Sequence, residues 1–192
     1  MLFRSLELSL RNIIDFALKL TLGNEWLQTL KQQYMQKDKS KTSFEERLLL
    51  EISKIENKYT KCSKPLPKRD QYISNLSLGF WVKIADEFKI CSILFNPSLL
   101  DFRNYGGSYN NRDISKAQKH WKIIYAMNLL LIIRNKAYHW ENLLKLNANN
   151  NPNITYQNNK NYKLIASITP NKINKFLEDF LKTINSKLMR YL

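Results

Sequence analysis

Three residues in one short stretch of the chain have the types and spacing that metal-free phosphoryl chemistry needs. In the segment IIRNKAYHWEN they are Arg134, Asn135 and His139, and they lie where an apolar run turns polar. On a helix Asn135 and His139 share a face, and the long side chain of Arg134 can swing back toward it. Imidazole moves protons near neutral pH, and guanidinium pairs with phosphate through two donors. The pattern indicates RNA cleavage with the 2′-hydroxyl as nucleophile, His139 moving a proton and Arg134 stabilising charge on phosphate.

The same pattern also has an ordinary structural explanation, since an Arg and a His five residues apart on a helix can arise without any catalytic role. Three neighbours are candidate RNA contacts, namely Lys136 and the two aromatic residues Tyr138 and Trp140 that flank His139 and could stack on bases. Near the start of the same predicted helix lies a basic patch of Lys116, Lys119 and Lys122, together with His120. This patch either touches the phosphate backbone or is a solvated face.

No metal or cofactor is expected from the sequence. His120 and His139 are separated by roughly 28 Å along a helix, too far to share one ion. Cys62 and Cys91 form no CxxC pair, which argues against a zinc ribbon or a disulfide scaffold and fits the reducing cytosol. The chain contains no P-loop, GxGxxG or HExxH motif. We therefore expect a cytoplasmic protein whose chemistry relies on its own side chains.

The charge of the chain favours a polyanionic partner. The 192 residues include 31 Lys and Arg against 16 Asp and Glu, for a net charge of +15. Residues 1–96 hold 16 basic and 11 acidic residues, whereas residues 97–192 hold 15 and 5. Abundant lysine explains part of this surplus, but not the scarcity of acidic residues in the second half. Nucleic acid is the first candidate partner and an anionic membrane surface the second.

Hydrophobic spacing predicts a single all-α domain, a bundle of about five to seven helices. Only 4 Gly and 5 Pro argue against an all-β fold. We expect helices over residues 2–22, 25–35, 43–59, 72–88 and 113–146 and a last one beginning at 170, with Ser43, Asp70, Asp113 and Thr169 as N-caps. Residues 96–112 and 147–161 are expected to be irregular loops, with a short strand near 162–168. The apolar run 123–133 is too short to cross a membrane and predicts a helix buried on most sides.

Three segments resemble the HEPN superfamily and, within it, the Abi-like abortive-infection family of the AbiD/AbiF type. The segment IIRNKAYHWENLLKLN looks like the HEPN signature of an Arg, a polar residue and a His a few residues later. NLSLGFWVKIADEF, at Asn75 to Phe88, is similar to the Abi-like segment Leu-Ser/Thr-Phe-Gly-Phe-Trp. LSLRNIIDFAL, at Leu8 to Leu18, resembles the N-terminal helix of that family.

The resemblance implies a single HEPN-like helical domain over residues 1–192 that dimerises and cleaves RNA without a metal. It assigns Arg134 to phosphate binding, Asn135 to positioning and His139 to acid–base work. It also implies a role in antiphage defence as an abortive-infection effector or toxin, with an antitoxin or non-coding RNA as partner. Glu141 stands where one toxin subgroup has a modified tyrosine, so no regulation by adenylylation is inferred. A non-catalytic RNA-binding module and a peripheral membrane protein are the alternatives.

Overall fold

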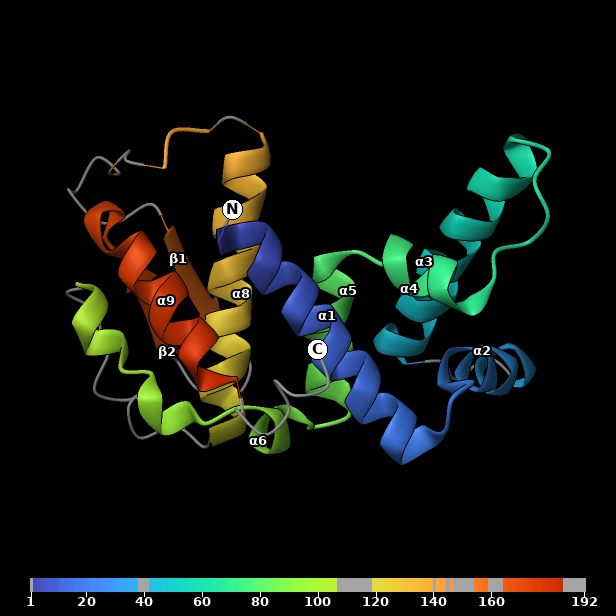
Figure 1. Cartoon of the computed structure of the whole chain (residues 1–192), viewed down its shortest axis with the longest axis horizontal. Helices are drawn as coiled ribbons and strands as arrows, with labels where there is room; N and C mark the ends of the chain where they lie inside the picture. Colours follow the sequence, from blue (N-terminus) through green and yellow to red (C-terminus); the bar gives the residue numbers. More distant parts are fainter. Residues whose placement is uncertain are drawn as a thin grey trace. The chain divides into compact units, whose positions relative to one another are not determined.

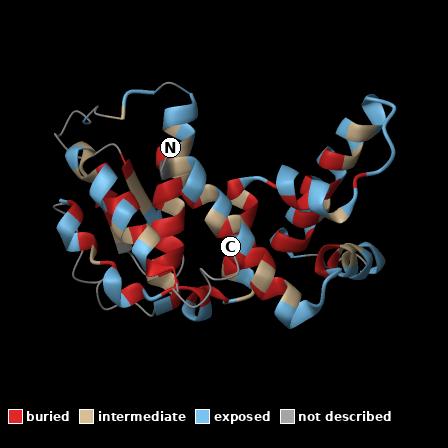
Figure 2. Cartoon of the chain, in the orientation of Figure 1, coloured by how far each residue is buried: buried red, intermediate tan, exposed pale blue. Residues whose placement is uncertain are grey.

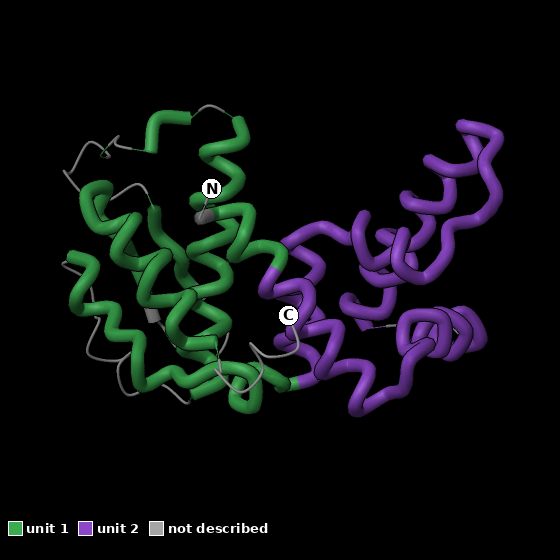
Figure 3. Tube along the Cα trace, in the orientation of Figure 1, with its two compact units in different colours: residues 1–8, 89–192 green, residues 9–88 purple. Residues whose placement is uncertain are grey.

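The computed structural model describes residues 2–37, 42–106, 119–139, 141–143, 146, 154–158 and 164–184. The fold is all-α, with one small two-stranded sheet among the described residues (Figure 1). The chain divides into two compact units, residues 1–8 with 89–192, and residues 9–88 (Figure 3). We refer to them as unit 1 and unit 2.

The described residues of unit 2 form helices and no strand. The unit contains α1 from Ser9 onward and then α2 to α5, with bounds α1 (Leu2–Leu22), α2 (Trp26–Gln36), α3 (Ser43–Lys61), α4 (Arg69–Asn75) and α5 (Leu78–Glu87). Its core is aromatic: the ring of Trp81 packs edge-on against Trp26 and Phe80, and Phe44 stacks on Phe80. Such rings bury large apolar areas and add specific edge-to-face contacts.

Three expectations for unit 2 were wrong in detail. Asp70 is not an N-cap, because α4 begins at Arg69 with Lys68 as its N-cap residue and Asp70 lies in the first turn. Thr42, not Ser43, is the N-cap of α3: it accepts a hydrogen bond from the Glu45 amide, and the Glu45 carboxylate accepts one from the Thr42 amide. The helix expected over 72–88 is two helices, α4 and α5, and Ser77 caps the second by accepting from the Phe80 amide. A capping serine inside an apolar pattern restarts the helix, so periodicity alone did not reveal the break.

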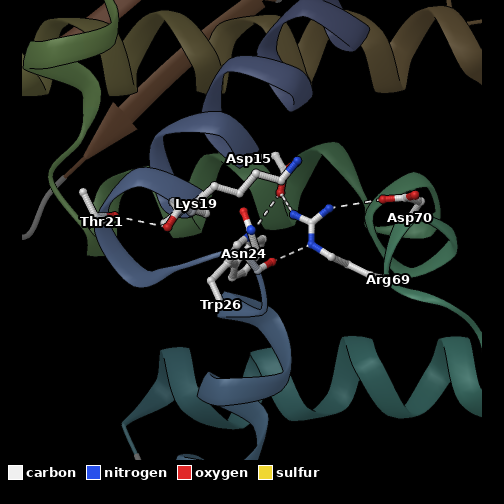
Figure 4. Close-up of polar contacts among 8 residues, drawn as sticks. Asp15, Lys19, Thr21, Asn24, Trp26, Arg69 and Asp70 are labelled. Atoms are coloured by element: carbon white, nitrogen blue, oxygen red, sulfur yellow. Dashed lines mark hydrogen bonds and ion pairs between the residues drawn. The ribbon is translucent and has the colours of Figure 1, made fainter.

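A buried carboxylate holds three elements of unit 2 together. Asp15 on α1 is 7% exposed and accepts a hydrogen bond of 2.9 Å from the Trp26 indole. It also pairs with the Arg69 guanidinium of α4 and, at 3.0 Å, with Lys19. Arg69 Nε donates to the Asn24 carbonyl at 2.7 Å, so the arginine bridges Asp15 and the turn before α2 (Figure 4). A buried charge needs such partners, and here it has three.

In unit 1 the long helix α8 (Lys119–Tyr138) is packed on several sides. It contacts β1 (Ile154–Asn158), α6 (Cys91–Leu94) and the 3-10 turn η1 (Pro97–Leu99). The prediction that the apolar run 123–133 forms a helix buried on most sides is confirmed. Its buried residues are Ile123, Ile124, Tyr125, Ala126, Met127, Leu129, Leu130 and Ile133. Figure 2 shows this middle of α8 largely in red, while the C-terminal end of the helix is pale blue and tan.

The sheet and the last helix complete unit 1. Strand β1 pairs antiparallel with β2 (Leu164–Ile168), with Ile154 opposite Ile168. The chain then passes through η3 (Pro170–Lys172), with Thr169 as its N-cap residue, into α9 (Ile173–Thr183). A second 3-10 turn, η2 (Phe102–Tyr105), packs against α9, where the Tyr105 and Phe176 rings meet at 5.4 Å.

Several boundaries in unit 1 differ from those expected. α8 ends at Tyr138 rather than near 146, because Glu141 and its amide fold back onto Lys136. The predicted start of this helix at Asp113 lies outside the described residues. The expected loops at 96–112 and 147–161 contain η1, η2 and β1, whose short elements lack a long apolar period. The strand expected near 162–168 is β2.

Candidate functional site

The three predicted site residues lie together at the exposed end of α8. Arg134 and Asn135 belong to its last turn, and His139 follows Tyr138, the last helical residue. The His139 amide donates to the Asn135 carbonyl at 3.0 Å, so the helical path continues through the histidine. Asn135 and His139 therefore share one face, as the four-residue spacing predicts. Both are exposed, and Arg134 is half-buried.

The turn after α8 is held by two contacts between Lys136 and Glu141. The Glu141 amide donates to the Lys136 carbonyl at 2.9 Å, and Lys136 Nζ lies 2.9 Å from a carboxylate oxygen of Glu141. The hydrogen bond from Lys136 holds the pKa of the Glu141 carboxyl below its usual range, and a smaller electrostatic contribution from His139 acts in the same direction. This turn positions His139 at the point where the chain leaves the helix.

Arg134 is oriented by its neighbours on the helix. Its Nη1 donates to Asn135 Oδ1 at 3.3 Å, and its guanidinium lies 4.9 Å from the centroid of the Tyr138 ring. A guanidinium over an aromatic face is attracted by the ring electrons, and the stack limits its rotation. The Tyr138 ring in turn meets the His139 ring edge-on at 6.0 Å. The four side chains thus form a continuous row from Asn135 through Arg134 and Tyr138 to His139.

One residue of this site was not predicted. Glu7 on α1 places Oε2 3.9 Å from Arg134 Nε, and the two side chains are 22% and 35% exposed. Glu7 lies in an amphipathic helix near the N-terminus, and nothing in the local sequence links it to Arg134. Only the packing of the first turns of α1 in unit 1 brings the carboxylate to the guanidinium.

The other candidate RNA contacts differ in their surroundings. Tyr138 is 71% exposed, as a base platform requires. Lys136 is engaged with Glu141. Lys122 is half-buried, and burial lowers the pKa of its ammonium. The charge of Asp101 raises this pKa, whereas the charge of Arg103 lowers it further. Trp140 and Lys116 lie outside the described residues.

Lys119 lies elsewhere, in a pocket of about 500 Å³ in unit 1. It is exposed there, and Lys182 from the end of α9 lines the same pocket. Of the predicted basic patch, Lys119 lines this pocket, and Lys122, three residues later on the same helix, is half-buried. His120, between them, is buried.

Across the described part of the chain, no three His, Cys, Asp or Glu side chains are grouped so as to bind a metal ion. The arrangement at the end of α8 supplies a proton-transfer group, a fixed cation and an aromatic face. A proton-transfer group and a cation are among the groups that phosphodiester cleavage by an internal hydroxyl uses.

None of the helices in the described ranges combines the length and apolar character needed to cross a membrane. Compared with known proteins, the chain matches no family model, no curated protein and no solved structure.

Proposed function

We propose that this chain is a metal-independent endoribonuclease of the HEPN type that acts as a homodimer. The observation that carries the proposal is the row of Asn135, Arg134, Tyr138 and His139 at the exposed end of α8. The net charge of +15 supports attraction of RNA to the chain. The resemblance of three segments to Abi-like proteins also supports RNA as the substrate.

In the proposed reaction the 2′-oxygen of one nucleotide bonds to the adjacent phosphorus, and the bond from phosphorus to the 5′-oxygen breaks. One His139 accepts the proton from the 2′-hydroxyl, and the histidine of the second subunit gives a proton to the leaving 5′-oxygen. Arg134 stabilises the charge that develops on the phosphate oxygens. The products are a 2′,3′-cyclic phosphate and a 5′-hydroxyl.

The homodimer is proposed because one chain offers only one histidine at this site. Leu131 and Ile132 are half-buried on the last turns of α8, and Asn135 follows Leu131 and Ile132 at helical spacing. Half-exposed apolar side chains next to an exposed polar site suit contact with a second copy. Ile132→Glu should give a monomer in light scattering and abolish cleavage, whereas Leu99→Glu, which replaces an exposed apolar side chain of η1 away from this site, should leave both unchanged. A monomeric wild-type protein that still cleaves would contradict this part of the proposal.

The proposed biological role is antiphage defence by abortive infection, or the toxin of a toxin–antitoxin pair. In that role, expression of the wild-type chain halts growth, and expression of His139→Ala does not. Equal growth arrest by both proteins, at matched levels, would argue against RNA cleavage as the cause of toxicity.

A second candidate function is an RNA-binding module without catalysis, holding a partner RNA. The exposed Tyr138 ring under Arg134 favours it, because such a platform binds bases without any proton transfer. In this case His139→Ala would bind RNA as tightly as wild type, and neither protein would cut it.

A further inference from the structure

Basic residues are concentrated between the end of α3 and the start of α4, where five of the six are lysines and the sixth, Arg69, pairs with Asp15. Residues 54–69 contain six basic residues and one acidic residue, Glu56. Their net charge of +5 equals that of residues 1–96 as a whole, so the rest of that half is neutral. An even scatter of lysine through the chain would not produce such a local excess. We call Lys54, Lys58, Lys61, Lys64 and Lys68 the α3 lysine surface.

The helix places three of these lysines on one side. Lys54, Lys58 and Lys61 follow one another at spacings of four and three residues, the spacing of neighbours on a helical face. All three are exposed, and with Asn57 and Cys62 they line a surface hollow of about 500 Å³. The hollow lies wholly within unit 2.

The backbone after α3 brings a fourth lysine back to the same helix end. Ser63 has a left-handed conformation with φ of 52°, and the Lys64 amide donates to the Tyr59 carbonyl at 3.0 Å. This is the hydrogen-bond pattern of a capped helix C-terminus, which turns the chain over the last turn. Pro65 and Pro67 then restrict the segment that leads to Lys68. The backbone that carries Lys64 is therefore held close to the end of α3.

Little negative charge compensates these lysines. Lys54 Nζ lies 3.4 Å from Glu51, and Lys58 Nζ donates to the neutral Asn75 side chain at 3.4 Å. Among the described residues, Lys61, Lys64 and Lys68 form no ion pair with a carboxylate. Glu56, the one acidic residue of the run, is engaged by Lys31 and by the Tyr72 hydroxyl.

The helix dipole explains only part of this arrangement. Cations in the last turn of a helix interact favourably with its C-terminal carbonyls, which suits Lys58 and Lys61. That interaction fades beyond the last turn, yet the lysines continue to Lys64 and Lys68 in the loop. A row of mostly uncompensated cations that extends past the helix favours a polyanion as partner.

We propose that the α3 lysine surface binds the phosphate backbone of single-stranded RNA without reading its sequence. Hydroxyl and amide groups border the lysines at Asn57 and Thr60 and suit hydrogen bonds to phosphate and ribose. A membrane surface is less suited, because Leu66 is the one large apolar side chain exposed within residues 54–69. The inference shares its substrate with the proposed function, but it rests on residues of unit 2 and needs no catalysis.

The test measures RNA affinity against salt in the His139→Ala protein, which keeps the RNA intact. The probe is a fluorescein-labelled uridine oligonucleotide, followed by anisotropy. In the same protein, Lys58→Gln, Lys61→Gln and Lys64→Gln combined should reduce the slope of log affinity against log salt by about 2, since each phosphate contact on a single strand contributes about 0.7. Affinity at fixed moderate salt should fall about tenfold. Arginine at the same three positions should preserve both values.

Two further measurements separate this inference from its rivals. Lys61→Gln alone should lower the slope, whereas Lys83→Gln, an exposed lysine elsewhere in unit 2, should not. An unchanged slope in the triple variant, or equal loss from Lys83→Gln, would overturn the inference. The inference would also be overturned if the triple variant lost binding to phosphatidylserine vesicles but bound RNA as before, because that result would assign the surface to membranes. If the triple variant behaves as expected but the wild-type chain cuts no RNA, the inference stands and the proposed cleavage fails.

Discussion

The Glu7 carboxylate lies 3.9 Å from Nε of Arg134, which places an acidic group beside the cation proposed to hold the phosphate. Both side chains are partly exposed, so the pair itself contributes little to stability. The pair matters instead for phosphate binding, because the Glu7 carboxylate competes with an incoming phosphate for the positive charge of Arg134. We therefore expect Glu7 to weaken the attraction between Arg134 and an incoming phosphate.

We predict that Glu7→Gln lowers KM for RNA by up to about fivefold, because an exposed ion pair is worth up to about 1 kcal/mol. Steady-state cleavage of a labelled RNA measures this change. Glu178→Gln removes the same charge from an exposed position on α9 and serves as the matched control. A rise in KM for Glu7→Gln, or an equal fall in both variants, would contradict the competition described above.

Tyr138 is predicted to bind RNA through its ring rather than its hydroxyl. Stacking of one base on an aromatic side chain is worth about 1–3 kcal/mol, so Tyr138→Ala should weaken RNA binding about tenfold or more. Tyr138→Phe keeps the ring and should bind as wild type does. Anisotropy in the His139→Ala protein measures both variants, and equal losses in the two would exclude stacking.

The buried Asp15 is predicted to be a major source of stability in unit 2. Asp15→Asn leaves Arg69 facing an uncharged group in a buried setting, and we expect a loss of about 3 kcal/mol in the free energy of unfolding. Asp70 pairs with the same guanidinium at 3.2 Å, but its side chain is 95% exposed. Asp70→Asn should therefore change stability by less than about 0.5 kcal/mol. Urea unfolding followed by tryptophan fluorescence compares the two, and equal effects would contradict this interpretation.

Asp179 is predicted to make unit 1 sensitive to acid. Burial alone would raise the pKa of this carboxyl, but hydrogen bonds from Lys175, Tyr105 and Lys182 outweigh it and hold the pKa below its ordinary value. Because the folded pKa is the lower one, its stabilisation is present above the ordinary pKa of about 3.9 and is lost as pH falls through the folded value. The melting temperature of wild type should therefore fall more steeply than that of Asp179→Asn below about pH 4. Parallel curves for the two proteins would exclude Asp179 as the group responsible.

The main helices could be predicted from the sequence because their apolar residues repeat at helical spacing. The apolar run of α8 predicts a helix buried on most sides, and the structure confirms it. The break between α4 and α5 could not be found in the same way, because it depends on one hydrogen bond from the Phe80 amide to Ser77. Likewise the end of α8 is set by the bond from Lys136 to Glu141, which periodicity does not reveal.

The candidate site shows the same division. The shared face of Asn135 and His139 follows from helical spacing alone. Glu7 could not be predicted, since only the packing of α1 in unit 1 brings it to Arg134. The α3 lysine surface was not predicted, although residues 54–69 carry a net charge of +5, and the position of its fourth lysine depends on the left-handed Ser63 that turns the chain back.

The most direct test of the central claim is the chemistry of the RNA ends. Wild-type protein is incubated with labelled RNA in EDTA, and the products are analysed by mass spectrometry. We predict a 2′,3′-cyclic phosphate and a 5′-hydroxyl, no cleavage of the matching 2′-deoxy oligonucleotide, and no cleavage by Arg134→Ala or His139→Ala that melt like wild type. Retained cleavage in both variants, or products that end in a 3′-hydroxyl, would contradict the assignment of Arg134 and His139.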